Sequence, residues 1–193
     1  MPLIVLEGID KAGKDAQSKF LGRELTKRGC QVELIAFPDY ATHLGKELKK
    51  FLEGKINLRS EVRQLLYVAN RWERQRDVER WLKEEVFVIA DRYVPSGIAY
   101  GLANGLDLNW MLSLEKGLPA AEMVIVIDIS TETSYKRDAS RDFYEKNRVF
   151  LRKVRGSYFE LAKRFGWDVV DGEMVKGDVA QEILKRVTCH FNI

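Results

Sequence analysis

The sequence predicts a single α/β domain in which a parallel five-stranded sheet lies between layers of helices. Three observations predict it. Short apolar runs of strand length recur, helical patterns separate them, and a glycine-rich turn follows the first run. The length suits one domain, and no linker, repeat or low-complexity segment divides residues 1–193.

The expected strands are short and mostly apolar, as parallel strands buried on both faces are. They lie at residues 3–6, 31–36, 86–90, 123–129 and 168–170. The expected helices lie at residues 14–28, 43–53, 60–84, 108–114, 131–140, 149–165 and 178–187. We expect one break within 60–84, and we place Trp72 in the core. Because strands and helices alternate, helices are predicted on both faces of the sheet.

Composition and charge indicate a globular protein. The chain has 32 Lys and Arg against 29 Asp and Glu, and no basic run is long enough for a nucleic-acid-binding arm. We find neither a signal peptide nor an apolar run of transmembrane length, and expect a cytoplasmic protein without membrane or nucleic-acid partners. Cys30 and Cys189 lie far apart, indicate neither a zinc site nor a disulfide framework, and are expected to be buried.

A glycine-rich turn after the first strand carries the clearest chemical signal. Residues 8–14 read GIDKAGK, which fits the first seven positions of the pattern G-x-x-x-x-G-K-[ST]. In such a loop, backbone N–H groups and the positive end of the following helix face phosphate oxygens. Lys14 is expected to reach the β and γ phosphates of ATP. The predicted ATP-binding residues here are Gly8, Ile9, Asp10, Lys11, Ala12, Gly13, Lys14, Asp15 and Ala16.

The eighth position of this pattern departs from it. Asp15 stands where a Ser or Thr hydroxyl normally binds Mg²⁺, and Ala16 follows. A carboxylate is a good magnesium ligand, although it adds negative charge beside the phosphates. We therefore expect a shifted Mg²⁺ site that includes Asp15. The alternative is a nucleotide-binding module that has lost catalysis.

Two polar residues, Asp91 and Arg92, follow the third predicted strand. Open α/β sheets bind their ligands at the carboxyl ends of parallel strands. Asp91 could hold Mg²⁺ through water or orient the attacking phosphate. Arg92 could clamp an acceptor phosphate and spread charge in the transition state. The alternative is a helix cap followed by a solvated arginine.

Six segments carry a resemblance to a known family. They are residues 7–14 (EGIDKAGK), 37–38 (FP), 69–73 (ANRWE), 91–100 (DRYVPSGIAY), 117–119 (GLP) and 137–145 (RDASRDFYE). In this order they resemble thymidylate kinases, which are P-loop nucleoside-monophosphate kinases. The resemblance implies a three-layer P-loop kinase fold with a lid near residues 138–148. It also implies transfer of the ATP γ-phosphoryl group to dTMP, with Mg²⁺, to give dTDP and ADP.

The resemblance further implies roles for residues around the phosphates and sugars. Asp10 is similar to a carboxylate that holds the dTMP 3′-hydroxyl or steers the loop. Lys11 stands where some members support the transferred phosphoryl group, and Arg92 would grip the dTMP phosphate. Tyr100 would crowd the sugar 2′ position, and Arg137 would lie against the adenine of ATP. The resemblance and the motifs together give four catalytic residues, Lys14, Arg92, Lys11 and Asp91.

The same resemblance implies how the thymine base is held. Phe37 would pack on the base or sugar, and Tyr67 would stack on thymine. Arg71 would donate to a thymine carbonyl oxygen, and Ser96 would lie near the base edge. Tyr144 would close over dTMP from the lid.

Some positions depart from the family pattern. Tyr40 stands where many members carry an arginine on the acceptor phosphate, which leaves more of the phosphate clamp to Arg92. Phe143 stands where a lid arginine is common, so Arg141 or Arg148 would supply that charge. A broader deoxynucleoside-monophosphate kinase and a deoxynucleoside kinase stay open as alternatives. The family resemblance also implies a homodimer.

Overall fold

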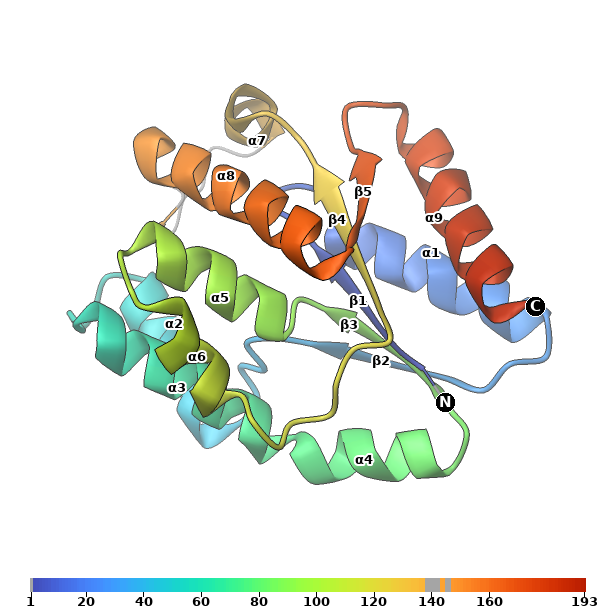
Figure 1. Cartoon of the computed structure of the whole chain (residues 1–193), viewed down its shortest axis with the longest axis horizontal. Helices are drawn as coiled ribbons and strands as arrows, with labels where there is room; N and C mark the ends of the chain where they lie inside the picture. Colours follow the sequence, from blue (N-terminus) through green and yellow to red (C-terminus); the bar gives the residue numbers. More distant parts are fainter. Residues whose placement is uncertain (1, 138–142, 145–146) are drawn as a thin grey trace.

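A computed structural model describes residues 2–137, 143–144 and 147–193, and these form a three-layer α/β domain (Figure 1). The described residues include a parallel sheet with the strand order β2-β3-β1-β4-β5. Its strands are β1 (Leu3–Glu7), β2 (Val32–Ala36), β3 (Phe87–Asp91), β4 (Met123–Asp128) and β5 (Asp168–Asp171). The predicted fold class and the five predicted strands are therefore confirmed.

The central strand β1 explains why a continuous apolar run folds in this way. All five of its residues are buried, and it pairs with β3 on one side and β4 on the other. Leu3 and Val5 pack into the core on one face of the sheet with Val78, whereas Ile4 and Leu6 pack with helix residues on the other. A strand covered on both faces needs apolar residues at every position.

The helices lie on both faces of the sheet. They are α1 (Lys14–Lys27), α2 (His43–Leu52), α3 (Ser60–Glu73), α4 (Gln75–Lys83), α5 (Val94–Ala103), α6 (Leu108–Leu114), α7 (Thr131–Arg137), α8 (Arg148–Phe165) and α9 (Lys176–Phe191). Figure 1 shows α1 beside α9, and α5 beside α8, in agreement with their contacts. The loop after β1 contacts α5, since Tyr100 donates to Asp10, and α5 packs against α3. These two helices carry most of the candidate site.

Three sequence-based expectations about the fold are corrected. The helix α5 was not among the expected helices, because its two glycines give it low intrinsic propensity, and it packs on α8. Trp72 is 40% exposed and does not belong to the core. Cys189 is exposed and Cys30 is half-buried, so neither is fully buried, and both are free thiols.

The predicted break within 60–84 is confirmed at Arg74, between α3 and α4. The predicted helix at 131–140 is described only as far as Arg137. Most of the predicted lid, including Arg141, lies outside the described residues, and only Phe143, Tyr144, Asn147 and Arg148 of it can be placed.

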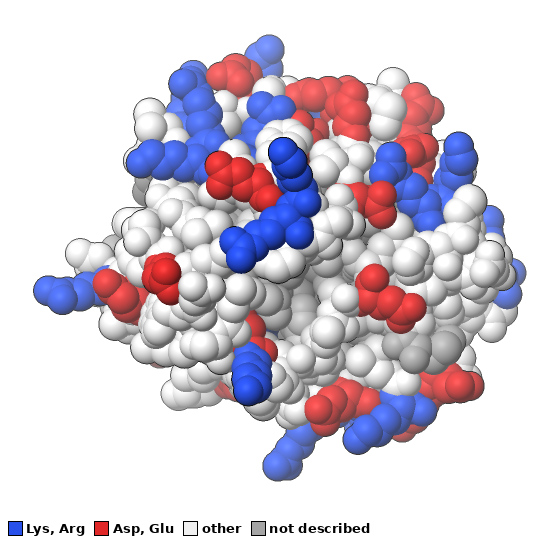
Figure 2. Space-filling model, viewed as in Figure 1, with Lys and Arg blue, Asp and Glu red and all other residues white. Residues whose placement is uncertain are grey.

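Charged side chains of both signs are interspersed on the face of the molecule that Figure 2 shows. This agrees with the small formal net charge of +3. In the part of the chain that the structure describes, no helix is long and apolar enough to cross a membrane. The expectation of a cytoplasmic protein without nucleic-acid partners stays a prediction.

Candidate active site

The phosphate loop, residues 8–14, leaves the end of β1 and enters α1. Gly8 has a φ of 137°, and a Cβ atom there would lie 2.4 Å from the carbonyl oxygen of Ile127. Only glycine fits at this point, because the backbone of β4 occupies the space of any side chain. The predicted strand, turn and helix around the motif are thus present.

Lys14 is the buried cation of this loop. Its Nζ donates to the carbonyl oxygens of Gly8 at 3.2 Å and Ile9 at 3.0 Å. Burial, and then the positive charge of Arg92, lower the pKa of Lys14 from 10.5 to about 8, although nearby carboxylates oppose this shift. An ammonium group held by neutral carbonyls in this way has a strong preference for an anion.

Arg92 joins the phosphate loop to the carboxyl end of β3. It has a φ of 66°, which non-glycine residues seldom adopt. Its Nη1 donates to the carbonyl oxygen of Gly8 at 3.0 Å and to Ser96 Oγ at 3.0 Å, and its Nη2 pairs with Asp10. Lys14 and Arg92 therefore donate to the same carbonyl oxygen, and two cations meet at one point of the loop.

Asp10 faces both Arg92 and the neighbouring aromatic wall. The hydroxyl of Tyr100 donates to its Oδ2 at 2.7 Å. Burial opposes ionisation of Asp10, but the charges of Arg92 and Lys14 outweigh burial and lower its pKa. Asp10 is therefore an ionised group that holds Arg92 and Tyr100 in place.

Glu7 is a functional residue that the motif reading overlooked. It is fully buried and accepts hydrogen bonds from the N–H groups of Tyr93 at 2.9 Å and Ser96 at 3.0 Å. Its other oxygen accepts from Ser96 Oγ at 2.5 Å and Tyr158 Oη at 2.8 Å. Burial raises the pKa of Glu7 despite these bonds and the charge of Arg92. The sequence held one signal for this role, because Glu7 is a charged residue at the end of an otherwise apolar strand.

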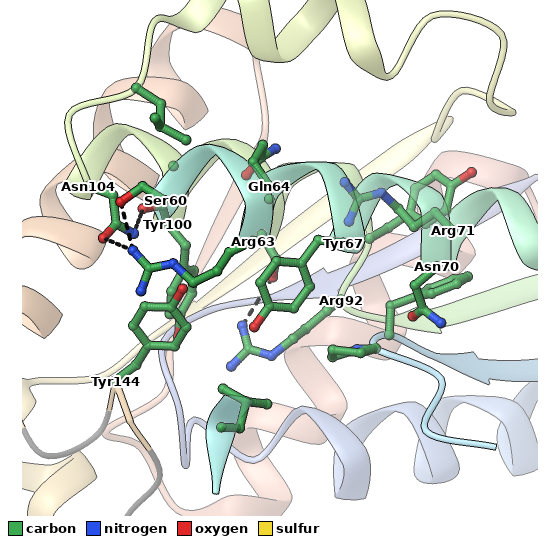
Figure 3. Close-up of a pocket in the computed structure, with 18 of the residues that line it drawn as sticks. Ser60, Arg63, Gln64, Tyr67, Asn70, Arg71, Arg92, Tyr100, Asn104 and Tyr144 are labelled. Carbon is green, nitrogen blue, oxygen red and sulfur yellow. Dashed lines mark hydrogen bonds between the residues drawn. The ribbon is translucent and has the colours of Figure 1, made fainter. Parts of the chain in front are cut away.

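A cavity opens beside this network, and we call it the acceptor cavity (Figure 3). Its walls come from α3 and α5, the end of β3 and the segment after β2. All eight residues predicted to bind dTMP line it: Asp10, Phe37, Tyr67, Arg71, Arg92, Ser96, Tyr100 and Tyr144. The sequence thus predicted which residues meet here, although their individual roles stay predictions.

Aromatic rings form much of the cavity wall. The rings of Phe37 and Tyr93 lie 5.4 Å apart, and those of Tyr100 and Tyr144 lie 5.3 Å apart. Tyr144 also stacks on Phe150 at 5.1 Å. Flat aromatic surfaces of this kind suit a planar base or the face of a sugar.

Comparisons with known proteins agree with this geometry. Residues 6–183 match the family model described as Thymidylate kinase. The chain belongs to the thymidylate kinase family. It is 35% identical over 185 residues to a thymidylate kinase of Arabidopsis thaliana, covering 96% of this chain and 68% of that protein. It is 33% identical over 172 residues to the human thymidylate kinase, covering 88% of this chain and 81% of that protein.

A solved structure of the thymidylate kinase from Candida albicans has the same fold. It superposes with a TM-score of 0.89 at 29% sequence identity, covering 99% of this chain and 92% of that one. The predicted family and its P-loop kinase fold are therefore confirmed.

Arg71 is buried, and it is not a surface residue. Its Nε donates to Glu115 Oε2 at 3.0 Å, and its Nη2 pairs with the other carboxylate oxygen. Glu115 lies just beyond α6, far from Arg71 in the sequence, and no local motif pointed to it. The pair fixes the direction of the Arg71 guanidinium at the edge of the acceptor cavity.

Ser96 lines the cavity but is bound mainly to its protein neighbours. Its backbone and hydroxyl both contact Glu7, and its Oγ lies 2.9 Å from Tyr158 Oη. Ser96 Oγ also accepts a hydrogen bond from Arg92. Ser96 therefore links the buried carboxylate of Glu7 to the guanidinium of Arg92. Ser96 thus supports Arg92, and its predicted contact with the base edge stays a prediction.

Arg137 lies on the other side of the phosphate loop and does not line the acceptor cavity. Its Nη1 donates to the carbonyl oxygen of Lys11 at 3.0 Å, and its Nη2 to that of Gly172 at 3.2 Å. Lys11 itself has a φ of 66°. These two basic residues therefore lie together at the phosphate loop and outside the acceptor cavity, and their roles toward ATP stay predictions.

The two carboxylates predicted to bind Mg²⁺ differ in position. Among the described residues, no group of three or more His, Cys, Asp or Glu could hold a metal ion. The side chain of Asp15 is 69% exposed and pairs with Lys19 at 2.7 Å. Asp91 is half-buried at the end of β3, and its charge acts on Lys14. Asp91 fits an ion whose remaining ligands are phosphate oxygens and water, as Mg²⁺ prefers.

Two more buried polar residues of α3 were overlooked. Arg63 donates to Ser60 Oγ at 2.7 Å and to Asn104 Oδ1 at 3.0 Å, and Gln64 lies one residue further along. With Tyr67 and Arg71, both lie on the helix face that lines the cavity. Their spacing was the available signal. Gln64 precedes Tyr67 by three residues and Arg71 by seven, and Arg63 precedes Tyr67 by four, so all lie on one face of the helix.

Proposed function

We propose that this protein transfers the γ-phosphoryl group of ATP to dTMP and so forms dTDP and ADP. One observation carries the proposal. Lys14 of the phosphate loop and Arg92 of the acceptor cavity donate to the same carbonyl oxygen of Gly8. A phosphate bound by each cation would place donor and acceptor phosphates next to each other, as direct transfer requires.

The protein's part in this reaction is positioning and charge neutralisation. Backbone N–H groups of the phosphate loop, with Lys14 and Lys11, would hold the donor phosphates. Arg92 would hold the acceptor phosphate, and Asp10 and Ser96 fix its guanidinium. We infer direct in-line transfer without a covalent enzyme intermediate, because the described groups are electrostatic clamps.

Mg²⁺ would supply charge neutralisation on the donor phosphates when it is bound. We propose Asp91 as the carboxylate that holds it, directly or through water. Asp15 as a ligand stays a prediction, because its carboxylate would first have to leave Lys19.

We propose that the acceptor cavity selects a deoxypyrimidine nucleotide. Tyr67 would stack on the base, with Phe37 on the other wall, and Arg71 would donate to a base carbonyl oxygen. Tyr100, held by Asp10, would fill the space of a 2′-hydroxyl group. Arg137 would contact the adenine of ATP beyond the loop.

A panel of acceptors tests this function. Purified protein with ATP and Mg²⁺ is given dTMP, dUMP, dGMP or thymidine, and nucleotide products are separated by chromatography. We expect dTDP formation with the highest kcat/KM among the four. Equal use of dGMP would instead identify a broad kinase, and use of thymidine alone a nucleoside kinase. Tight binding without any product would identify a non-catalytic module.

We also propose that the protein is a homodimer that buries one face of α3. Val62, Leu65 and Trp72 are 42%, 47% and 40% exposed, and their spacing puts them on one side of the helix. An apolar row of this kind suits a second copy of the same chain. Sedimentation equilibrium should give twice the mass of one chain. Leu65→Glu should give the single-chain mass, whereas Val149→Glu, at an exposed site on α8, should not.

A further inference from the structure

A buried side-chain amide on α3 has no hydrogen-bond partner. Gln64 is 3% exposed, and its Nε2 finds no acceptor among the described residues. Burying an amide N–H without a hydrogen-bond partner is unfavourable. Gln64 nevertheless lines the acceptor cavity, so a ligand atom could satisfy it.

The surroundings of Gly97 show where this amide points. A Cβ atom at Gly97 would lie 2.9 Å from Arg71 Nη2, 3.3 Å from Gln64 Nε2 and 3.4 Å from Arg71 Nη1. Nitrogen atoms of two side chains that lie two turns apart on α3 therefore surround one position above α5. Any side chain at residue 97 would occupy that space.

Arg71 is oriented so that its remaining donors stay available there. Its Nε and Nη2 donate to Glu115, whereas Nη1 is the guanidinium nitrogen that does not pair with that carboxylate. Gln64 Nε2 and Arg71 Nη1 both carry N–H groups. A ligand atom between them must therefore accept hydrogen bonds.

We propose that Gln64 is a specificity-determining residue, whose amide donates together with Arg71 to the keto oxygen at C4 of a pyrimidine base. The proposal rests on the proposed function. A keto oxygen has two lone pairs and can accept both donors. The amino group of cytosine would instead bring its own N–H groups against theirs and leave buried donors unpaired.

The position of Gln64 relative to Arg92 supports the C4 edge. In Figure 3, Gln64 and Arg92 lie on opposite sides of Tyr67. With the acceptor phosphate at Arg92, the far edge of the base points toward Gln64. C4 is the ring atom opposite N1, which bears the sugar, whereas the oxygen at C2 lies beside it.

The decisive variant is Gln64→Met, which keeps the length of the side chain and removes the amide. We expect kcat/KM for dTMP to fall about tenfold, mainly through KM, the magnitude of one hydrogen bond in a site that excludes water. We expect kcat/KM for dCMP to fall less or to rise, so that the preference for dTMP over dCMP falls. An unchanged preference overturns the proposal.

A stability measurement separates this role from a structural one. Because Nε2 has no protein partner, Gln64→Met should not lower Tm in the absence of nucleotide, but it should reduce the rise in Tm that dTMP causes. A lower Tm together with an unchanged dTMP effect overturns the proposal. Gln75→Met is the matched control, because Gln75 bonds to Glu79 on α4 and does not line the cavity. It should leave the dTMP preference unchanged.

A second variant reverses the hydrogen-bonding pattern. Gln64→Glu replaces the donor with an acceptor, so it should favour the amino group of dCMP and disfavour dTMP. If dCMP gains nothing relative to dTMP in this variant, the assignment of C4 is wrong. Failure of the proposed function looks different, because the wild-type protein would then form no dTDP at all.

Discussion

The phosphate loop and the base-facing wall of the acceptor cavity are built in different ways. The loop is one stretch of seven residues, and its lysine donates to carbonyl oxygens of the same stretch. The wall combines α3, α5 and the residue Glu115 beyond α6, and it leaves the Gln64 amide without a partner. Phosphate binding is therefore encoded locally, whereas base selection depends on tertiary contacts.

This difference predicts how each region responds to substitution. Changes at the loop and its neighbour Arg92 should act on catalysis and leave the discrimination between bases intact. Changes in the wall should act on KM and on base preference, and on stability where they break the buried pair of Arg71 and Glu115. Four substitutions test this contrast.

Removing the cation that both regions share should have the largest effect. In Arg92→Ala, the acceptor phosphate loses its clamp, and turnover should fall by roughly 10³-fold or more. Steady-state kinetics with saturating dTMP measures this, and circular dichroism checks the fold. Near-normal turnover would show that Arg92 does not take part in transfer.

Breaking the buried pair in the wall should have the next largest effect. Glu115→Gln leaves the buried Arg71 without a counterion and should lower the free energy of unfolding by about 3–5 kcal/mol. Chemical denaturation measures this change. The matched control is Glu24→Gln, which removes a helix-surface pair with the exposed Lys27 and should cost far less stability. Equal losses in the two variants would contradict the difference in burial.

Removing the loop cation should stabilise the fold while it abolishes activity. The pKa of Lys14 is about 8 in the folded protein against 10.5 as its ordinary value. This shift corresponds to roughly 3 kcal/mol of unfavourable burial below pH 8. Lys14→Met should therefore raise Tm at pH 7, as functional groups often cost stability.

The pH dependence gives the sign of this effect. Between the two pKa values the unfolded chain binds more protons at Lys14, so the stability of the wild-type protein should rise there with pH. The advantage of Lys14→Met should therefore shrink between pH 8 and 10. A constant difference in Tm across this range would contradict the lowered pKa.

Asp15 should give the smallest effect of the four. Its carboxylate is exposed and pairs only with Lys19 among the described ion pairs, so Asp15→Asn should change kcat by less than about twofold. The Mg²⁺ concentration for half-maximal activity should stay the same, whereas Asp91→Asn should raise it. A large rise with Asp15→Asn would establish Asp15 as a metal ligand.

The sequence predicted the fold and most of the site because both rest on local patterns. The apolar runs correspond to the strands, and the motif around Gly8 lies between a strand and a helix, as expected. The resemblance to thymidylate kinases indicated eight of the residues that line the acceptor cavity. Apolar runs and short motifs can be recognised without knowing how distant parts of the chain pack together.

What the sequence could not predict depends on packing. The helix α5 forms despite its glycines because it lies against α8, and Trp72 is exposed although its helical spacing suggested the core. Glu7 and Glu115 bind residues that are distant in the sequence. Residues this far apart in the sequence cannot be recognised as partners until the fold brings them together.

The Gly8 carbonyl oxygen has a consequence for proton balance. It receives donors from two cations and so holds Arg92 close to Lys14. Burial, and then the charge of Arg92, favour the uncharged form of Lys14. A nucleotide phosphate beside Lys14 would restore the ammonium form. Above pH 8, nucleotide binding should therefore draw a proton from solution. The heat of binding would then vary with the ionisation enthalpy of the buffer, which is a calorimetric signature of the buried lysine beside Arg92.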